Sequence, residues 1–296
     1  MFCNKEYLKF IESSRQKGLD IVGASVIQTL GSTYSKAGNM ILINSNEEFI
    51  GVLGSPSLHN KIYAFGKEVL QSRESLHFEN TPKDKKSGHG ISRYLIQPFF
   101  YAENYGALGI SLDNIGKTLS RSIKDFSFEI IDESIETKLE NERFYQTIQK
   151  PYSLLIFGSG SHVTSLISMA NLMAWETTVI DREIKEEYVN EADNLIKLEN
   201  LKDILSYDLS SYNAAVILSH CPNTDDTYLE ALLDSNVEYI GILGNKKNMQ
   251  KKREQFNLQD DKRYFAPVGF DIGGNTHQSI ALSICAQIEA RKNGKI

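Results

Sequence analysis

The chain has 296 residues, of which 41% are hydrophobic and 24% charged, and its formal net charge is −6. These values are typical of a two-domain globular protein and give no electrostatic reason to expect a nucleic-acid partner. No apolar run is long enough to span a membrane, so we expect no membrane partner. The first residues are too charged for a signal peptide, and the three cysteines (Cys3, Cys221 and Cys285) form no CxxC pair. We therefore expect a cytoplasmic protein.

Residues 1–145 predict a smaller α/β domain. The pattern indicates helices and extended segments in this order: a helix over 6–17, extended segments over 20–30, 39–44 and 48–54, a helix over 57–72 and an extended segment over 93–102. The second and third extended segments are typical of a hairpin, and residues 80–90 are typical of an exposed loop. Residues 134–150 are polar and lack a clear apolar stripe, and the domain boundary is expected near Pro151.

Residues 150–296 alternate between strand and helix patterns. Strands are expected over 152–157, 177–181, 194–198, 213–219, 237–244 and 264–270, with helices between them and a closing helix over 277–292. Strands separated by helices of this length imply a parallel sheet with crossover helices on its faces. The predicted fold class is therefore α/β, with a C-terminal Rossmann-like domain.

The segment LLIFGSGSHVTSL, residues 154–166, runs from a strand through a glycine turn into a helix. Gly158 permits a tight turn, and Gly160 lets the backbone approach a pyrophosphate at the helix N-terminus. Ser159 and Ser161 complete the predicted loop. Val163 occupies the place of the third glycine of a dinucleotide-binding fingerprint, which predicts a wider angle between helix and strand.

An acidic residue follows this loop at the spacing that a ribose-binding carboxylate requires. Asp181 ends the second strand, about twenty residues after the glycines. This spacing predicts that the domain binds NAD(H) or a related adenine nucleotide. Asp181 would repel the 2′-phosphate of NADP, and Arg182 partly offsets this repulsion, so the predicted preference for NAD over NADP is modest. Trp175, the sole tryptophan, precedes this strand, so we expect its emission to report NADH binding. The alternative is a Rossmann-shaped domain that has lost its nucleotide.

Further segments carry the resemblance to a known family. The C-terminal half, through SHCPNTDDTYLEALLDSNVEYIGILGNKKNMQKKREQF and APVGFDIGGNTHQSIALSICAQIEA, resembles the Rossmann domain of the xanthine dehydrogenase accessory protein family, the XdhC/CoxI family. Upstream, VIQTLGSTYSKAGNMILINSNEEFIGVLGSPSLH is similar to the first domain of that family. The resemblance implies a maturation chaperone that binds the molybdenum cofactor, works with a cysteine desulfurase and delivers the cofactor to a molybdenum hydroxylase apo-enzyme.

The chain departs from the family pattern where the family carries cysteines. By resemblance, Ser57 in GSPSLH stands at a family cysteine and His59 at a family acid, while His89 in SGHG stands at a second cysteine. A serine hydroxyl cannot replace a thiolate as a soft ligand or persulfide carrier. His59 and His89 are weak candidates for replacement metal ligands. The alternative is that both are ordinary surface residues, because no metal-ligand spacing accompanies them.

The loop GSTYSKAG in the first half is a second candidate for anion binding. Gly31, Ser32 and Lys36 offer backbone donors, a hydroxyl and one cation. By resemblance this loop matches the family element GSxxRxxG, in which Lys36 stands near the arginine. The alternative, a surface turn between two strands, is equally compatible with these residues.

Four segments of the second half are expected at the carboxyl edge of its sheet, where ligands bind in open parallel sheets: 158–162, 219–221, 244–246 and 269–276. Gly244, Gly273 and Gly274 permit close backbone approach. Asn275 or Thr276 is expected to cap the last helix.

His220 and Asp271 are the candidates for catalytic groups at this edge. They would supply one group that titrates near neutral pH and one carboxylate. The alternative is that Asp271 only braces its loop and His220 only ends a strand. We expect the first-domain loops GSTYSKAG and GSPSLH to close this cleft, from the same chain or from the partner in a homodimer.

No Ser-His-Asp, HExxH or Walker motif is present, which disfavours hydrolase chemistry. Two hypotheses remain for the whole chain. One is an accessory chaperone related to the XdhC/CoxI family. The other is an NAD(P)-dependent oxidoreductase acting on a small substrate.

Overall fold

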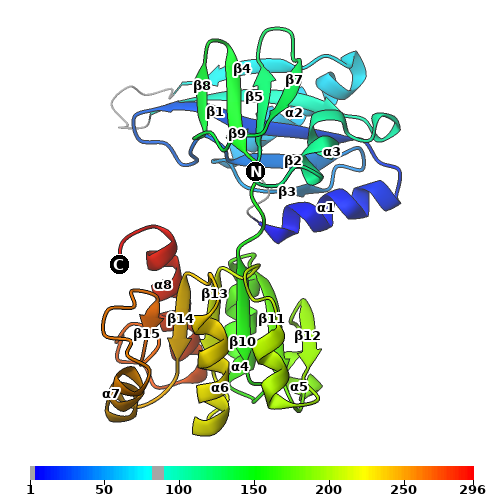
Figure 1. Ribbon diagram of the computed structural model, residues 1–296. Coiled ribbons are helices and arrows are strands. Elements are labelled where there is room, and N and C mark those ends of the chain that lie inside the picture. Colours follow the sequence, from blue (N-terminus) through cyan, green and yellow to red (C-terminus); the bar gives the residue numbers. More distant parts are fainter. Residues whose placement is uncertain (1–3, 82–89) are drawn as a thin grey trace. The chain divides into compact units, whose positions relative to one another are not determined.

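The chain forms two compact units, Met1–Lys150 and Pro151–Ile296. The computed structural model describes residues 4–81 and 90–296 (Figure 1). The two units are nearly equal in length. Among the described residues, no helix is both long and apolar enough to cross a membrane.

The first unit is built on a five-stranded antiparallel sheet. In the order β3-β2-β1-β5-β4, its strands are Phe49–Ile50, Met40–Asn44, Ile21–Leu30, Ile91–Phe99 and Leu76–Asn80. The predicted hairpin is present, with Leu42 opposite Ile50 and Ile43 opposite Phe49. The predicted helices and extended segments of residues 6–102 thus correspond to elements of the structure.

Helices cover both faces of this sheet. Helix α2 (Pro56–Ser72) packs Leu58, Ile62 and Val69 against one face. Helices α1 (Lys5–Gln16) and α3 (Gly106–Leu112) pack against the other face, and a 3-10 turn (Tyr101–Glu103) precedes α3. Each face therefore has its own apolar core.

A second antiparallel sheet follows, and the sequence did not predict it. In the order β7-β6-β9-β8, its strands are Phe128–Ile131, Thr118–Ser122, Arg143–Thr147 and Lys138–Glu140. Residues 134–150, which are polar and lack a clear apolar stripe in the sequence, contain β8 and β9. The pattern was hidden because the buried positions of β9 are Phe144 and Gln146, and only one of them is apolar.

Arg121 of β6 explains why this buried face is polar. Its side chain is 1% exposed, and its guanidinium donates to Gln97 Oε1 (3.0 Å), Gln146 Oε1 (3.1 Å) and Ser25 Oγ (3.3 Å). Ser25 and Gln97 belong to the first sheet, so these hydrogen bonds join the two sheets. Burial lowers the pKa of Arg121 to about 10.

The second unit contains the expected parallel sheet. In the order β12-β11-β10-β13-β14-β15, its strands are Asn194–Lys197, Glu176–Asp181, Ser153–Phe157, Ala214–Ile217, Tyr239–Ile242 and Tyr264–Phe265. Every neighbouring pair is parallel. The prediction of an α/β fold with a C-terminal Rossmann-like sheet is confirmed.

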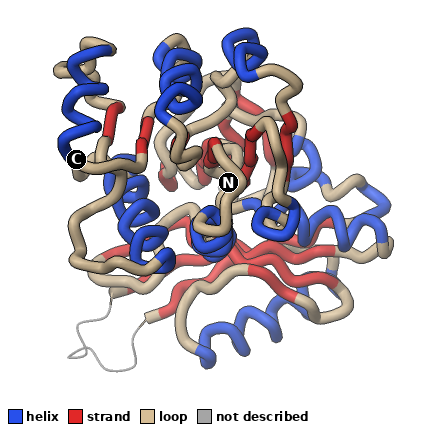
Figure 2. The backbone as a smooth tube through the Cα atoms, turned by 90° about the horizontal axis from the view of Figure 1, so that it is seen from below, coloured by secondary structure: helices blue, strands red, loops and turns tan. Residues whose placement is uncertain are grey.

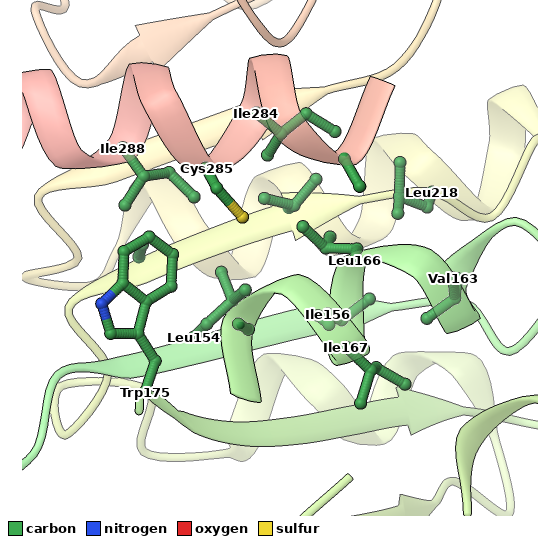
Figure 3. Packing of buried hydrophobic residues seen from close by; sticks show 14 of the residues in the cluster. Leu154, Ile156, Val163, Leu166, Ile167, Trp175, Leu218, Ile284, Cys285 and Ile288 are labelled. Atoms are coloured by element: carbon green, nitrogen blue, oxygen red, sulfur yellow. The ribbon is translucent and has the colours of Figure 1, made fainter. Parts of the chain in front are cut away.

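Helices lie on both faces of the parallel sheet (Figure 2). Helices α4 (Val163–Leu172), α5 (Glu186–Val189) and α8 (His277–Lys292) cover one face, where they pack with alternate residues of β10 such as Leu154 and Ile156 (Figure 3). The opposite face is covered by α6 (Pro222–Leu233), α7 (Lys246–Gln255) and the 3-10 helix Leu201–Ser206. Strand β10 connects to β11 on one side and pairs with β13 on the other, so the sheet reverses its strand order between β10 and β13.

Candidate functional site at the carboxyl edge of the parallel sheet

The loop after β10 passes directly beside the end of β13. Gly158 has φ = +110°, and a Cβ at this position would lie 2.9 Å from the carbonyl oxygen of Leu218. Only glycine fits this backbone conformation without strain. The predicted tight turn therefore lies at the point where the strand order reverses, which is where open α/β sheets bind ligands.

Helix α4 begins in this loop without a side-chain cap. His162 is its N-cap residue and forms no capping hydrogen bond, while the N–H of Val163 donates to Gly160 O (2.9 Å). The side chain of Val163 is fully buried and belongs to the same apolar core as Leu154 and Ile156. An uncapped helix N-terminus attracts anionic groups.

Asp181 lies at the end of β11 and is tied to the loop. Its Oδ2 lies 2.9 Å from Ser159 Oγ, and its Oδ1 accepts from the backbone N–H of Arg182 (2.7 Å). Ser159 is 2% exposed, and its single hydroxyl proton serves either Asp181 or Glu183 O, which lies 2.7 Å away. Ser159 therefore positions the loop rather than a ligand, whereas the half-buried carboxylate of Asp181 keeps lone pairs for further donors.

Three histidines gather at the same edge. The rings of His162 and His220 are 4.3 Å apart between centroids, and those of His162 and His277 are 6.5 Å apart. Together they border a cavity of about 170 Å³, whose other lining residues are apolar: Leu166, Leu218, Leu243, Ile280, Ala281 and Ile284. The cavity thus has an aliphatic floor and an imidazole rim.

His162 is the most constrained of the three. Its Nε2 lies 2.9 Å from Leu218 O, and because a carbonyl only accepts, Nε2 carries the proton. Burial lowers the pKa of His162, the bond to Leu218 opposes this, and the nearby His220 and His277 lower it further. Its ring also lies against Gly160, where a Cβ would come within 2.8 Å of Cε1. Gly160 therefore makes room for an imidazole of its own loop.

His220 and Cys221 follow β13 on the exposed side of the rim. His220 has φ = +56°, an uncommon conformation for a residue with a side chain. Cys221 is the N-cap residue of α6, and hydrogen bonds from Thr224 lower the pKa of its thiol. Behind them, Asp225 is buried and accepts from Ser219 Oγ (2.5 Å); burial raises its pKa. The rim thus carries an exposed imidazole beside a thiol whose pKa is lowered, with a buried carboxyl behind them.

The structure places the remaining candidates of this edge in different roles. Asp271 is exposed in the loop 269–276 and does not line the histidine cavity. Thr276, rather than Asn275, caps α8, because its Oγ1 accepts from the N–H of Ser279 (3.1 Å). Gly274 closely approaches the side chain of Ser279, and Gly273 has φ = +76° with no described atom within 4 Å of an added Cβ.

Gly244 and two exposed polar residues complete the predicted set in this unit. Gly244 follows β14 and leaves room for the side chain of Met249, which would come within 2.5 Å of an added Cβ. Ser161 and Arg182 are exposed at the edge. Their positions are compatible with ligand contact, which stays a prediction.

Sequence reasoning missed His162 and His277 as site residues. The signal was present, because one histidine follows each of β10 and β13 and another opens α8, in GSGSH, SHC and NTH. Elements that end at one edge of a sheet bring such residues together. Trp175, by contrast, is buried at the amino end of β11 against Tyr152 (5.1 Å), far along the cluster from Val163 (Figure 3). The expectation that its emission reports NADH binding stays a prediction.

Two of the first-unit candidates, Ser57 and His59, lie among the described residues. Ser57 is exposed in the first turn of α2, after the N-cap residue Ser55. His59 Nε2 accepts from the backbone N–H of Leu53 (3.1 Å), and its ring makes an edge contact with Phe49. His89 lies outside the described residues. Within residues 4–81 and 90–296, no group of three or more His, Cys, Asp or Glu side chains is arranged to hold a metal ion.

The loop 31–39 connects the paired strands β1 and β2. Gly31 has φ = +77°, and Ser32 O accepts from the N–H of Gly90 (2.6 Å). Lys36 is exposed. Gly38 O accepts from Gln146 Nε2 (2.7 Å), so the second sheet holds the end of this loop. The geometry is compatible with both interpretations, an anion-binding loop and a surface turn.

Comparison with known proteins identifies relatives over nearly the whole chain. A probable xanthine dehydrogenase subunit from Bacillus subtilis (strain 168) is 23% identical over 317 aligned residues, covering 91% of this chain and 92% of the relative. An uncharacterized protein of Escherichia coli (strain K12), YqeB, is 26% identical and covers 47% of this chain and 27% of its own length. The crystal structure of a xanthine dehydrogenase from Bacillus halodurans shares the fold, with a TM-score of 0.80, 21% identity and coverage of 100% of this chain and 97% of that chain.

Two family models match in the order that the fold requires. The model of the XdhC and CoxI family matches residues 14–79, in the first unit. The model of the XdhC Rossmann domain matches residues 154–288, which include the glycine loop, Asp181 and all three rim histidines. The two matches together cover about two thirds of the chain, and the chain belongs to the XdhC and CoxI family, with an XdhC Rossmann domain as its second unit.

Proposed function

We propose that this protein is an accessory factor for a molybdenum hydroxylase of the xanthine dehydrogenase type, and that its second unit binds NAD(H) or a related adenine nucleotide. The observation that carries the nucleotide proposal is the loop at the reversal of strand order, where Gly158 turns beside Leu218 and Ser159 ties the loop to Asp181. Family membership and the relative described as part of a probable xanthine dehydrogenase support the accessory role.

Each part of a dinucleotide has a matching group in this site. The carboxylate of Asp181 would accept from the ribose hydroxyls of the adenosine half, as its remaining lone pairs allow. The pyrophosphate would lie at the uncapped N-terminus of α4. Asp181 would repel the 2′-phosphate of NADP, and the exposed Arg182 beside it offsets only part of that repulsion, so we expect a modest preference for NAD.

The molybdenum cofactor fits this chain less well than the family resemblance suggests. Between residues 4 and 220 the sequence contains no cysteine, so the first unit offers no thiolate apart from Cys3. Ser57 carries a hydroxyl where the family carries a cysteine, and His59 uses its Nε2 on Leu53. We therefore propose that this protein retains the molybdenum cofactor more weakly than relatives with cysteine, and we derive no sulfur-transfer step from its residues.

The proposed partners follow from the same reasoning. An apo-enzyme of the molybdenum hydroxylase class remains the proposed client. A cysteine desulfurase is a weaker proposal, because persulfide transfer needs a thiolate that position 57 lacks. A homodimer is proposed as the working assembly, as the family resemblance suggests.

Isothermal titration calorimetry with NAD, NADP and ADP-ribose tests the nucleotide proposal. Asp181→Asn should lower the affinity for all adenine nucleotides by about tenfold, because a charged acceptor is lost. Asp260→Asn, at an exposed aspartate of the same unit, is the matched control and should not change it. Absence of binding at millimolar nucleotide, or equal binding by Asp181→Asn, would overturn the proposal.

A turnover assay separates the accessory role from the oxidoreductase alternative. The histidine cavity beside the nucleotide loop is the feature that favours an enzyme, since an imidazole there could exchange a proton with a substrate. An accessory protein should bind NADH without consuming it. Steady oxidation of NADH with a small carbonyl substrate would favour the oxidoreductase.

A further inference from the structure

We propose that the histidine cavity is the subsite for the nicotinamide ring of a bound dinucleotide, and that its rim favours the uncharged reduced ring over the cationic oxidised ring as the pH falls. This inference rests on the proposed nucleotide function and extends it to the redox state of the ligand. It is carried by the size, the position and the charge of the cavity.

The size and lining of the cavity suit one flat ring. Its volume of about 170 Å³ is close to that of cavities that bind a single benzene ring, about 150 Å³. The floor is formed by aliphatic side chains of α4, α8 and the ends of β13 and β14, and the only polar lining residues are the three histidines. Such a site binds a heteroaromatic ring through its faces and leaves the ring edge to the imidazoles.

The position of the cavity matches the reach of a dinucleotide. Asp181 ends β11 on one side of β10, whereas Leu218 and Leu243 of the cavity follow β13 and β14 on the other side. Three strand spacings of about 4.8 Å separate β11 from β14, a span of about 14 Å. An adenosine at Asp181 and a pyrophosphate at α4 therefore direct the second ribose and its ring toward the histidines.

The charges around the cavity come from few groups. His162 stays neutral most readily, because burial and the neighbouring His220 and His277 lower its pKa more than the bond to Leu218 O raises it. His220 and His277 are the exposed imidazoles of the rim, and histidine is the side chain whose charge changes between about pH 5 and about pH 8.

The other facing groups are the thiol of Cys221, beside His220, and the carboxyl of Asp225 on α6. Asp225 is buried and bonded to Ser219, and it offsets only part of a charge on His220. From β14, only the apolar Leu243 lines the cavity.

A charged rim acts differently on the two redox forms. Protonated His220 and His277 attract the pyrophosphate of either form equally, because NAD⁺ and NADH share that half. They repel only the cationic ring of NAD⁺, and water is partly excluded from the cavity floor, which strengthens the repulsion. The ratio of the two affinities therefore isolates the effect at the ring.

The experiment measures the affinities of NAD⁺, NADH and ADP-ribose by calorimetry between about pH 8 and about pH 6, the range in which histidine changes charge. We expect the preference for NADH over NAD⁺ to rise by about tenfold toward the lower pH, as expected for like charges at ring contact in a half-exposed site. The double variant His220→Gln with His277→Gln should abolish this rise. His77→Gln, at an exposed histidine of the first unit, is the control and should preserve it.

ADP-ribose distinguishes failure of the inference from failure of the proposed function. If ADP-ribose does not bind, the nucleotide site itself is wrong. If ADP-ribose binds as tightly as NADH at every pH, the ring makes no contact and the cavity is not its subsite. A ratio of NADH to NAD⁺ affinity that is constant with pH, or that rises equally in the double variant, would overturn the role of the rim.

Discussion

Substitution of Gly158 by alanine should destabilise the second unit more than the same substitution at Gly273, another glycine with positive φ in that unit. The backbone at Gly158 has φ = +110°, and the new Cβ would lie 2.9 Å from Leu218 O and 3.1 Å from Ser219 N. Strain at such a φ costs about 1–3 kcal/mol. The contact with a backbone carbonyl adds about 1 kcal/mol, because β13 cannot move without disturbing its pairing with β10. The expected loss in the free energy of unfolding is about 3 kcal/mol.

Gly273 provides the matched control in the same unit. It also has a positive φ, +76°, but an added Cβ would meet no described atom within 4 Å. Gly273→Ala therefore carries the conformational strain alone and should cost about 1 kcal/mol. The two variants should thus differ by about 2 kcal/mol in the free energy of unfolding. We assign this difference to the close approach of the loop to β13 and to the larger positive φ of Gly158.

Urea unfolding followed by tryptophan emission measures this loss in the correct unit. Trp175 is the sole tryptophan, is 1% exposed and packs on Tyr152, so its emission reports the second unit and not the first. Equal midpoints for Gly158→Ala and Gly273→Ala would show that the loop relaxes away from Leu218 without cost. The reasoning about the turn would then be refuted, together with the tight geometry that carries the nucleotide proposal.

Three further predictions test other parts of the chain. Burial lowers the pKa of His162, so as the pH falls this histidine is protonated in the unfolded chain before it is protonated in the folded one. The second unit should therefore lose stability below about pH 6.5, the ordinary pKa of histidine. His162→Gln should reduce that loss, measured by Trp175 emission during unfolding between neutral and acidic pH. An unchanged pH dependence would contradict this. Arg121→Met should destabilise the first unit by about 3 kcal/mol, because three buried acceptors lose their donor. The measurement is amide hydrogen exchange, which should become faster in β6 and β9. Exchange rates equal to those of the parent protein would argue against this prediction. Ser57→Cys should increase the molybdenum that co-purifies after co-expression with cofactor synthesis, measured by elemental mass spectrometry. Strong retention by the parent protein would refute the role assigned to Ser57.

The parallel sheet was predictable because its central strands are buried on both faces. Ser153–Phe157 and Tyr239–Ile242 are buried at every position, and such runs between helices are typical of a doubly covered sheet. The glycine loop and Asp181 were also readable, because their spacing follows from the strand-turn-helix geometry. The second antiparallel sheet was not, since β9 buries Gln146 as well as Phe144, and a polar inward residue breaks the alternation on which strand prediction depends.

Some residues of the candidate site were predicted from the sequence, and others were not. Gly158 and His220 were predicted from their place after a strand, and the structure places both at the carboxyl edge. His162 and His277 were missed because each is a single histidine in its own segment, and only the three-dimensional arrangement brings their rings within 6.5 Å. Asp271 had the sequence position of a site residue, but the structure leaves it exposed and outside the cavity lining.

The buried guanidinium between the two sheets of the first unit has a consequence for how that unit selects its arrangement. A slip of β9 by one residue along β6 would replace Gln146 with a neighbour whose side chain points to the opposite face. Arg121 would then be left with a positive charge and too few acceptors in a water-free space, whereas an all-apolar interface would tolerate the same slip at a much lower cost. The cluster thus specifies the register of β9 on β6, because the nearest incorrect register leaves a buried charge without its acceptors.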